Sequence, residues 1–265
     1  MNTWTTGKIR ALKGKRKFAC LTAYDYTTAG IVDAAGIELI LVGDSLAGTM
    51  LGYETTVPVT MDEMLHHTKA VVRGVKDALV TADMPFMSYQ ASIEQALLNA
   101  GRLLKEGGAG AVKIEGGSIR AELVKTLTDN GIPVLSHIGL TPQSVNETGG
   151  YRIQGRKDRD AEKLVKDAAE LEKAGAFAIV LECIPADLAR KITSGTGIPT
   201  IGIGAGPECD AQILVTHDML GLQSDISPRF VKRYASLADS MKEAFETYRS
   251  DVQSGAFPAE KHCYS

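Results

Sequence analysis

The chain has 265 residues, of which 44% are hydrophobic and 23% charged, so it is long and apolar enough to bury a large core. Its formal net charge of -3 argues against a nucleic-acid partner or an anionic membrane surface. No apolar run approaches the roughly 20 residues that cross a bilayer, no secretory signal follows the basic N-terminus, and the four cysteines lack zinc-ligand spacing, so we expect a cytoplasmic protein with reduced thiols.

Short apolar segments alternate with helical patterns along the chain. The apolar segments predict strands at 18–23, 39–42, 78–82, 111–114, 133–135, 176–181, 200–203 and 213–215. The helical patterns cover 3–13, 27–35, 61–75, 92–104, 118–128, 161–174, 186–193 and 228–253. This alternation favours a parallel sheet, and eight such units favour an α/β fold, a (β/α)8 TIM barrel, that forms one domain over residues 1–265 with an extra N-terminal helix. A doubly wound open sheet is the alternative.

Polar side chains follow most of the predicted strands. The strand ends carry Asp44 with Ser45, then Asp83, Glu115, His137 and Glu182. Lys113 lies two residues before Glu115, so both side chains point to the same face of their strand. In a TIM barrel the carboxyl ends of the strands form the mouth of the active site, so we expect these groups to converge there.

Each of these residues also has a purely structural explanation when it is taken alone. An aspartate after a strand, such as Asp83, often forms a turn or caps a helix, and a single buried histidine such as His137 is usually a core residue with its partners satisfied. Four carboxylates in one small mouth are different, because they cannot all ionise there without cations. Lys113 supplies one positive charge, and a divalent metal ion is the natural source of more.

Oxygen ligands without a thiolate favour a hard cation such as Mg²⁺ over Zn²⁺. Asp44 and Asp83, on neighbouring strands, are the candidate direct ligands of the metal, and Glu115 could hold a metal-bound water. A 2-oxo acid chelated by the metal would have its carbonyl polarised and its neighbouring C–H acidified. Glu182, across the mouth from Asp44, is then the candidate base that takes this proton.

Several stretches of the chain are long enough to compare with known families. They are LVGDS (41–45), LGYETTVPVTMDEM (51–64), ADMPFMSYQ (82–90), VKIEGG (112–117), HIGLTPQSVNETGGYRIQGR (137–156), LECIP (181–185) and GIGAGPECDAQILVTHDMLGL (202–222). Between about Lys17 and Tyr234, and in this order, they resemble the ketopantoate (3-methyl-2-oxobutanoate) hydroxymethyltransferase family. Two small departures from the family pattern are Ala47 and Ala211, which stand where we expect glycine.

The resemblance implies a barrel of the phosphoenolpyruvate mutase/isocitrate lyase type and one reaction. In that reaction 5,10-methylenetetrahydrofolate, 3-methyl-2-oxobutanoate and water give 2-dehydropantoate and tetrahydrofolate, the first step of pantothenate biosynthesis. The resemblance also implies Mg²⁺ held by Asp44 and Asp83, with Glu115 bound through water, and Glu182 as the catalytic base at C3. The substrate-binding residues that it implies are Asp44, Ser45, Asp83, Lys113 and His137. Members of the family commonly form decamers of two pentameric rings.

Two other functions stay open at this point. A Mg²⁺-dependent C–C lyase or phosphonomutase-type enzyme would share the fold, but lyases of that group carry a catalytic cysteine between strands four and five, and residues 118–131 contain none. A non-catalytic carboxylate-binding barrel is the second, but it would not need a carboxylate base beside a metal site. The sequence does not identify the residues that bind the folate.

Overall fold

The computed structural model describes residues 3–150, 152–223 and 228–264, and it divides into two compact units. The first unit runs from Met1 to Val215 and the second from Thr216 to Ser265. The strands of the described residues all lie in the first unit, and the expectation that residues 1–265 form one domain stays a prediction. None of the helices within the described ranges is long and apolar enough to cross a membrane.

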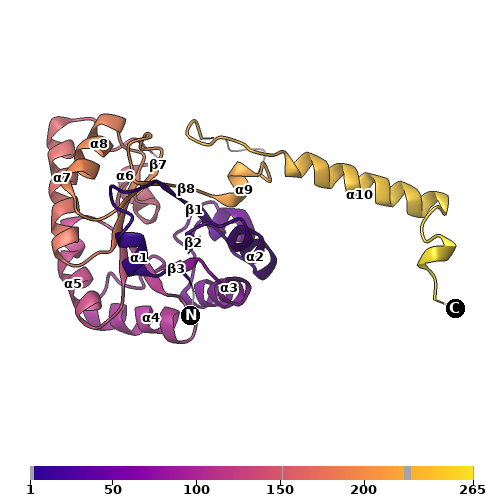
Figure 1. Ribbon diagram of the computed structural model, residues 1–265, viewed down its shortest axis with the longest axis horizontal. Coiled ribbons are helices and arrows are strands. Elements are labelled where there is room, and N and C mark those ends of the chain that lie inside the picture. The colour runs from indigo at the N-terminus through magenta and orange to yellow at the C-terminus, as the bar shows by residue number, and fades with distance from the viewer. Residues whose placement is uncertain (1–2, 151, 224–227, 265) are drawn as a thin grey trace. The chain divides into compact units, whose positions relative to one another are not determined.

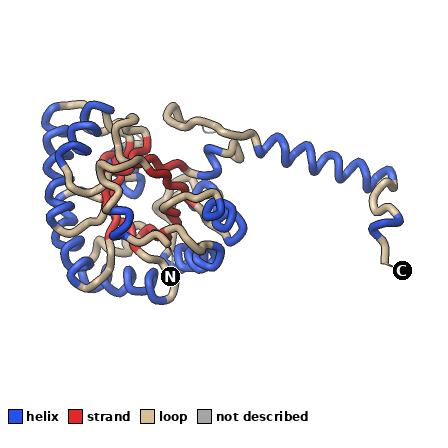
Figure 2. The backbone as a smooth tube through the Cα atoms, viewed as in Figure 1, coloured by secondary structure: helices blue, strands red, loops and turns tan. Residues whose placement is uncertain are grey.

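The first unit is a closed parallel barrel, which confirms the predicted fold and excludes the open sheet. Its strands are β1 (Phe18–Thr22), β2 (Leu39–Val42), β3 (Leu79–Asp83), β4 (Ala111–Glu115), β5 (Val134–Gly139), β6 (Ala178–Glu182), β7 (Thr200–Ile203) and β8 (Ala211–Leu214). Each strand pairs with the next, and β8 pairs with β1 to close the barrel. Figure 2 shows the strands at the centre of this unit with the helices around them.

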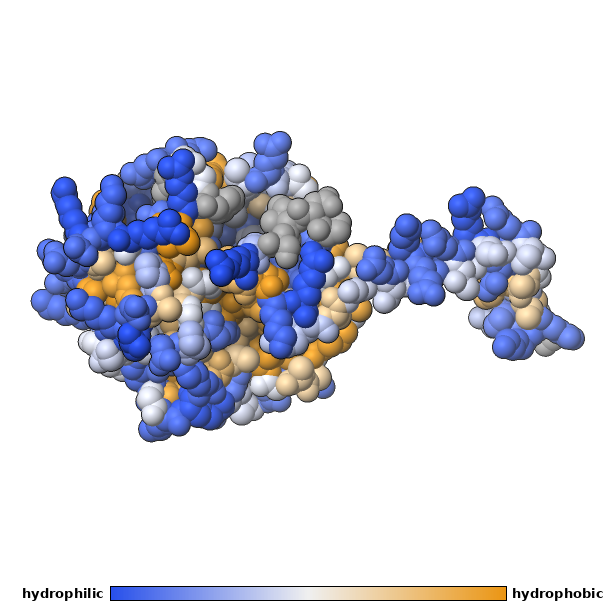
Figure 3. All heavy atoms as spheres, turned by 90° about the horizontal axis from the view of Figure 1, so that it is seen from above, coloured by the Kyte–Doolittle hydropathy of each residue, from blue (hydrophilic) through white to orange (hydrophobic). Residues whose placement is uncertain are grey.

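Six helices of the first unit alternate with the strands and form the outer layer (Figure 1). They are α2 (Tyr26–Ala34), α3 (Met61–Gly74), α4 (Ile93–Lys105), α5 (Ala121–Asp129), α7 (Asp158–Lys173) and α8 (Ala186–Gly195). Polar residues fix where several of them begin: Asp25, Thr60 and Ser92 each accept a hydrogen bond from the first turn, and Thr60 forms a capping box with Glu63. Figure 3 shows one face of the molecule, on which hydrophilic and hydrophobic side chains are both present.

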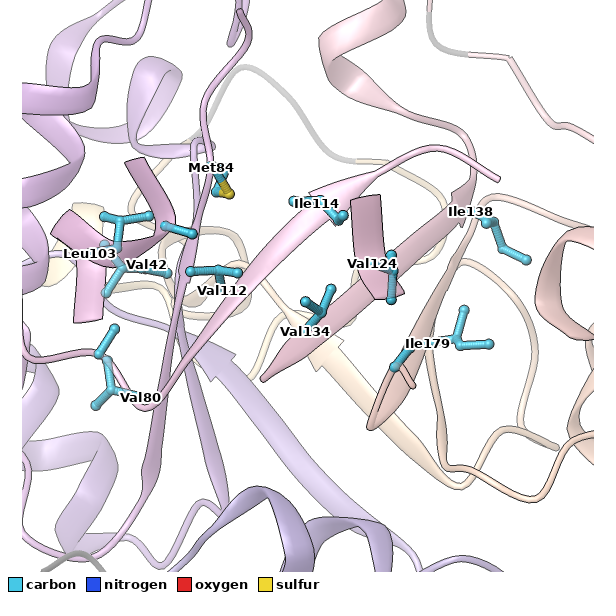
Figure 4. Close-up of a cluster of buried hydrophobic side chains, with 14 of the residues drawn as sticks. Val42, Val80, Met84, Leu103, Val112, Ile114, Val124, Val134, Ile138 and Ile179 are labelled. Carbon is cyan, nitrogen blue, oxygen red and sulfur yellow. The ribbon is translucent and has the colours of Figure 1, made fainter. Parts of the chain in front are cut away.

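Two layers of apolar side chains hold the barrel together. The outward-facing strand residues pack against the helices, and Figure 4 shows part of this layer, including Val112, Leu103 and Val124. The inward-facing residues near the strand N-termini form a second cluster, which also contains Ile9 of the short helix α1 (Thr6–Arg10). The N-terminal helix therefore closes the end of the barrel opposite the carboxyl ends of the strands (Figure 1).

The helix predicted at 118–128 begins with a 3₁₀ turn at Ser118–Arg120, before α5. The connections after β2 and β5 contain short helical turns that periodicity did not predict: a π-turn at Ala47–Leu51, a 3₁₀ turn at Pro142–Ser144 and α6 (Val145–Thr148). Each is too short to show a repeat in the sequence. The turn at Ala47–Leu51 begins at the residue that replaces an expected glycine, and Ala47 is buried there without a positive φ.

The second unit contains α9 (Thr216–Met219), α10 (Leu237–Ser254) and a 3₁₀ turn at Glu260–His262. The predicted helix at 228–253 is wrong over its first nine residues. The backbone N–H groups of Tyr234 and Leu237 donate to the carbonyls of Met219 and Leu220, so this segment packs along α9 instead of continuing the helix. The predicted strand at 213–215 is also displaced, because β8 begins at Ala211, opposite Phe18 of β1.

Candidate active site

The register of the barrel places the predicted site residues beside one another. Asp83 of β3 pairs with Lys113 of β4, and Glu115 of β4 pairs with His137 of β5. Side chains alternate along a strand, so all four point into the barrel, beyond the apolar interior cluster toward the carboxyl ends of the strands. Glu182 is the last residue of β6 and completes this layer.

A continuous chain of ionic contacts runs through these side chains. The Nζ atom of Lys113 lies 2.6 Å from Oδ1 of Asp83 and 3.7 Å from Oε1 of Glu115. His137 lies between two carboxylates, with Nδ1 3.4 Å from Oε1 of Glu115 and Nε2 3.2 Å from Oε2 of Glu182. The side chain of Glu182 is 16% exposed and the other four are almost fully buried. Glu182 is therefore the end of this chain that solvent reaches.

Asp44 and Ser45 reach the same end of the barrel from the turn after β2. The backbone N–H of Asp44 donates to Oδ2 of Asp83 over 2.9 Å, which ties the turn to β3. Gly43 makes this turn possible, because a Cβ atom there would lie 2.7 Å from Oγ of Ser45. That Oγ atom forms a 2.8 Å hydrogen bond with the hydroxyl of Tyr24. We call the buried side chains of Asp44, Asp83 and Glu115 the acid cluster.

The cationic groups beside the acid cluster keep their protons at neutral pH. Burial lowers the pKa of Lys113, but the three carboxylates outweigh it and raise the pKa above its usual value. Burial and the charge of Lys113 lower the pKa of His137, but the contacts with Glu115 and Glu182 raise it to about 9. Burial raises the pKa of Glu115, and the contacts with His137 and Lys113 reverse this, so its pKa is lowered. Glu115 is therefore ionised between two cations.

In contrast to Glu115, Asp44 lies in an environment that favours the protonated form of its carboxyl. Burial, together with the charges of Asp83 and Glu115, raises the pKa of Asp44 well above its usual value, and Lys113 offsets only part of this. Asp44 is 4% exposed, and its carboxylate accepts a 2.9 Å hydrogen bond from the uncharged side chain of Gln143. An additional positive charge at this position would favour its ionised form.

The donor set fits a hard metal ion that takes few ligands from the protein. Within residues 3–150, 152–223 and 228–264, no three His, Cys, Asp or Glu side chains converge closely enough to hold an ion by themselves. The oxygen atoms of Asp44 and its neighbour Asp83 fit Mg²⁺, which usually binds one or two carboxylates and keeps water and substrate oxygens as its other ligands. The metal-binding roles of Asp44, Asp83 and Glu115 stay predictions.

The structure brings all seven predicted site residues to one end of the barrel, and it adds two that the strand ends did not indicate. Gln143, in the 3₁₀ turn after β5, contacts both Asp44 and Glu115. The hydroxyl of Tyr89, in the segment after β3, lies 2.7 Å from Oε1 of Gln143. Both residues lie within motifs that resemble the family, which was the signal that could have identified them.

Two of the solved structures that share this fold are a phosphonopyruvate hydrolase and a 2,3-dimethylmalate lyase. A phosphonopyruvate hydrolase in complex with oxalate and Mg²⁺ superposes with a TM-score of 0.63 at 15% sequence identity, over 100% of this chain and 92% of that chain. A 2,3-dimethylmalate lyase, described as a member of the PEP mutase/isocitrate lyase superfamily, superposes with a TM-score of 0.62 at 17% identity, over 100% and 92%. At these identities the likeness shows the fold alone.

The fold defines a TIM barrel whose carboxylate, lysine and histidine side chains converge at the carboxyl ends of the strands, where enzymes of this fold place their active sites. The model of the family named ketopantoate hydroxymethyltransferase matches residues 3–260. The chain belongs to this family, and it is a hydroxymethyltransferase.

Curated relatives match the chain over nearly its whole length. The 3-methyl-2-oxobutanoate hydroxymethyltransferase of Clostridium novyi (strain NT) is 56% identical over 263 residues, which cover 99% of this chain and 95% of the relative. The enzyme of the same name from Carboxydothermus hydrogenoformans is 58% identical over 266 residues, which cover 100% and 96%. A one-carbon donor is implied by the name that these relatives carry.

Proposed function

We propose that this chain transfers a hydroxymethyl group from 5,10-methylenetetrahydrofolate to C3 of 3-methyl-2-oxobutanoate, with Mg²⁺ as its cofactor. The products are 2-dehydropantoate and tetrahydrofolate, and the reaction is the first step of pantothenate biosynthesis. Family membership supports the reaction. The observation that carries the chemistry is the unbroken chain of contacts from Asp83 through Lys113, Glu115 and His137 to Glu182.

The first step requires that C3 of the oxo acid lose a proton. Glu182 is the base, because its carboxylate ends the chain of contacts and is the member that solvent reaches. His137 holds Oε2 of Glu182 through Nε2, which leaves Oε1 to take the proton from C3. Mg²⁺ at Asp44 and Asp83, with Glu115 in contact through water, would polarise the keto group and lower the pKa of the C3–H bond.

The substrate needs positive charge and hydrogen-bond donors at its carboxylate. Lys113 supplies an ammonium group at the centre of the layer, and Ser45 supplies a hydroxyl that Tyr24 orients. His137 is the third group at this position, and its Nδ1 atom faces Oε1 of Glu115, beside Lys113. In the second step the electron pair left at C3 forms a bond to the one-carbon unit, and a water oxygen becomes its hydroxyl. Both C–N bonds of the methylene bridge break, and the proton removed from C3 and one proton of the water end on the two nitrogens of tetrahydrofolate.

We infer further that the enzyme works in the cytoplasm as a homo-oligomer, with the decamer of two pentameric rings as the assembly to test. All four cysteines are unpaired, which suits a reducing compartment. Sedimentation of the purified protein at several concentrations measures the mass of the assembly directly. A monomer at all concentrations would contradict this part of the proposal.

The reaction is tested by following product formation with mass spectrometry. Purified protein is incubated with Mg²⁺, the folate donor and 3-methyl-2-oxobutanoate, and we expect 2-dehydropantoate to accumulate until EDTA is added. Glu182→Gln should lose activity by at least about 10²-fold, the scale of a lost general base. Glu122→Gln, on the exposed surface of α5, is the matched control and should keep native activity. A folded native protein that forms no product would refute the proposed function.

A further inference from the structure

The side chain of Gln143 joins the segment after β5 to two members of the acid cluster. Its Nε2 atom donates to Oδ2 of Asp44 over 2.9 Å and to the backbone carbonyl of Met84 over 2.9 Å. Its backbone N–H donates to Oε2 of Glu115 over 3.1 Å. We propose that Gln143 is a positioning residue, which orients the carboxylates of Asp44 and Glu115 for the ion and the substrate. This inference rests on the proposed function.

The chemistry of the neighbours fixes which way the amide of Gln143 points. The carbonyl oxygen of Met84 can only accept a hydrogen bond, so the group that faces it must be the NH₂ of the amide. The same NH₂ group faces Asp44, and the amide oxygen therefore faces Tyr89. The glutamine thus uses its NH₂ group as a donor to two partners and its amide oxygen as an acceptor, without placing a charge beside Asp44.

Tyr89 closes a ring of hydrogen bonds around Glu115. The backbone N–H of Glu115 donates to the hydroxyl oxygen of Tyr89 over 3.2 Å. That hydroxyl donates to Oε1 of Gln143 over 2.7 Å, and the backbone N–H of Gln143 returns to Oε2 of Glu115. All three residues are buried, so each of these bonds is shielded from competing water. The ring holds Gln143 in place before any ligand arrives.

In both Glu115 and Asp44, one carboxylate oxygen accepts a hydrogen bond from Gln143, which leaves the other oxygen for a different contact. In Glu115, Oε2 accepts from Gln143, and Oε1 faces Lys113 and His137. In Asp44, Oδ2 accepts from Gln143, which fixes the plane of the carboxylate and the direction of Oδ1. Hydrogen bonds to the side chains that bind a metal ion orient those side chains. Removing such a hydrogen bond typically lowers metal affinity or activity by about 10- to 100-fold.

Three variants separate the contributions of this ring. Gln143→Leu keeps the approximate volume and removes the donors and the acceptor of the side chain. Gln143→Glu keeps an acceptor for Tyr89 but places another carboxylate against Asp44. Tyr89→Phe removes only the hydroxyl. Gln154→Leu is the matched control, because Gln154 lies in the same segment and its side-chain NH₂ bonds to the carbonyl of Arg152, away from the acid cluster.

The readouts are the dissociation constant of Mg²⁺ by calorimetry, the kcat and KM of the oxo acid, and backbone hydrogen exchange in peptides from 140–147. We expect Gln143→Leu and Gln143→Glu to weaken Mg²⁺ binding by about 10- to 100-fold, and Tyr89→Phe by less. We expect kcat/KM to fall with Mg²⁺ affinity and hydrogen exchange in 140–147 to accelerate in each of these variants. Gln154→Leu should match the native protein in all three readouts.

The outcomes distinguish this inference from the proposed function. Native Mg²⁺ affinity and native kcat/KM in Gln143→Leu or Gln143→Glu would overturn the positioning role, even if the native enzyme forms product. If the native protein neither binds Mg²⁺ nor forms product, the proposed function fails, and hydrogen exchange still tests the ring. Unchanged exchange in Tyr89→Phe would then show that the ring does not hold Gln143. Should Gln143→Leu fail to fold, Gln143→Glu and Tyr89→Phe provide the same tests.

Discussion

The Nζ atom of Lys113 lies 2.6 Å from Oδ1 of Asp83, and both side chains are almost completely buried. The β3–β4 register makes these two residues direct neighbours, so the contact is a consequence of the barrel and not of a flexible side chain. Since the same ammonium group also faces Glu115, it balances a large part of the negative charge of the acid cluster.

Lys113→Met should therefore be costly, because it leaves buried carboxylates without this charge. Removing one partner of a buried ion pair typically costs about 3–5 kcal/mol, and we expect the free energy of unfolding in urea to fall by about this amount. Lys125→Met is the control, since Lys125 pairs with Asp129 on the surface and such pairs contribute about 0.3–0.5 kcal/mol. Equal losses in the two variants would contradict the structural role of Lys113.

Gly117 should not tolerate a side chain, because a Cβ atom there would overlap the carboxylate of Asp167. That carboxylate accepts from the backbone N–H of Ser118 over 2.8 Å, so it cannot move without breaking the bond. We expect Gly117→Ala to lower the free energy of unfolding by about 1–3 kcal/mol, the usual cost of overpacking.

Gly101→Ala is the matched control for this substitution. Gly101 lies within α4 with open space around it, so alanine there should be neutral or stabilising by up to about 1 kcal/mol. Gly117→Ala combined with Asp167→Ala should cost less than the sum of the two single losses, because the overlap is relieved. Simple additivity in this cycle would show that the overlap is not the cause.

The carboxyl of Asp210 should make the free energy of unfolding depend on pH in the acid range. Burial raises the pKa of this carboxyl, but the bond from Lys13 and the backbone N–H groups of Thr200 and Gly14 reverse the effect and lower it. A group whose pKa is lowered by folding stabilises the native state above its unfolded value, about 3.9, and this contribution is lost as the pH falls through the lower folded value.

We therefore expect Asp210→Asn to be less stable than the native protein at neutral pH, and the two to converge as the pH falls below about 4. Thermal unfolding from neutral to acid pH measures this difference. Asp158→Asn, at the exposed start of α7, is the control and should follow the native profile. A difference between native and Asp210→Asn that stays constant down to acid pH would contradict the assignment.

Much of the fold could be predicted from the sequence because most strands contain a short apolar run, and β3, β4 and β6 each end in a carboxylate residue. Leu39–Val42 and Ala111–Glu115 are fully buried, so their residue types alone identify them as strands. β8 was harder, because Gln212 is exposed and interrupts the apolar run, and only pairing with β1 shows where the strand begins. α9 was missed because four residues do not establish a helical period.

Only part of the candidate site could be predicted from the sequence. Lys113 and Glu115 could be placed together because the alternation of a strand fixes their common face. Gln143 and Tyr89 could not be placed, because they lie in connecting segments whose path follows from tertiary contacts and not from a repeat. The position of His137 between two carboxylates also depends on strand register, which a single sequence does not specify.

In the proposed reaction, Glu182 removes the C3 proton of the oxo acid. The most direct measurement is NMR of 3-methyl-2-oxobutanoate incubated with the protein and Mg²⁺ in D₂O, without the folate. We predict exchange of the C3 proton for deuterium that stops with EDTA and falls by at least about 10²-fold in Glu182→Gln, while Glu122→Gln exchanges at the native rate. Native exchange in a folded Glu182→Gln variant, or none in the native protein, would contradict it.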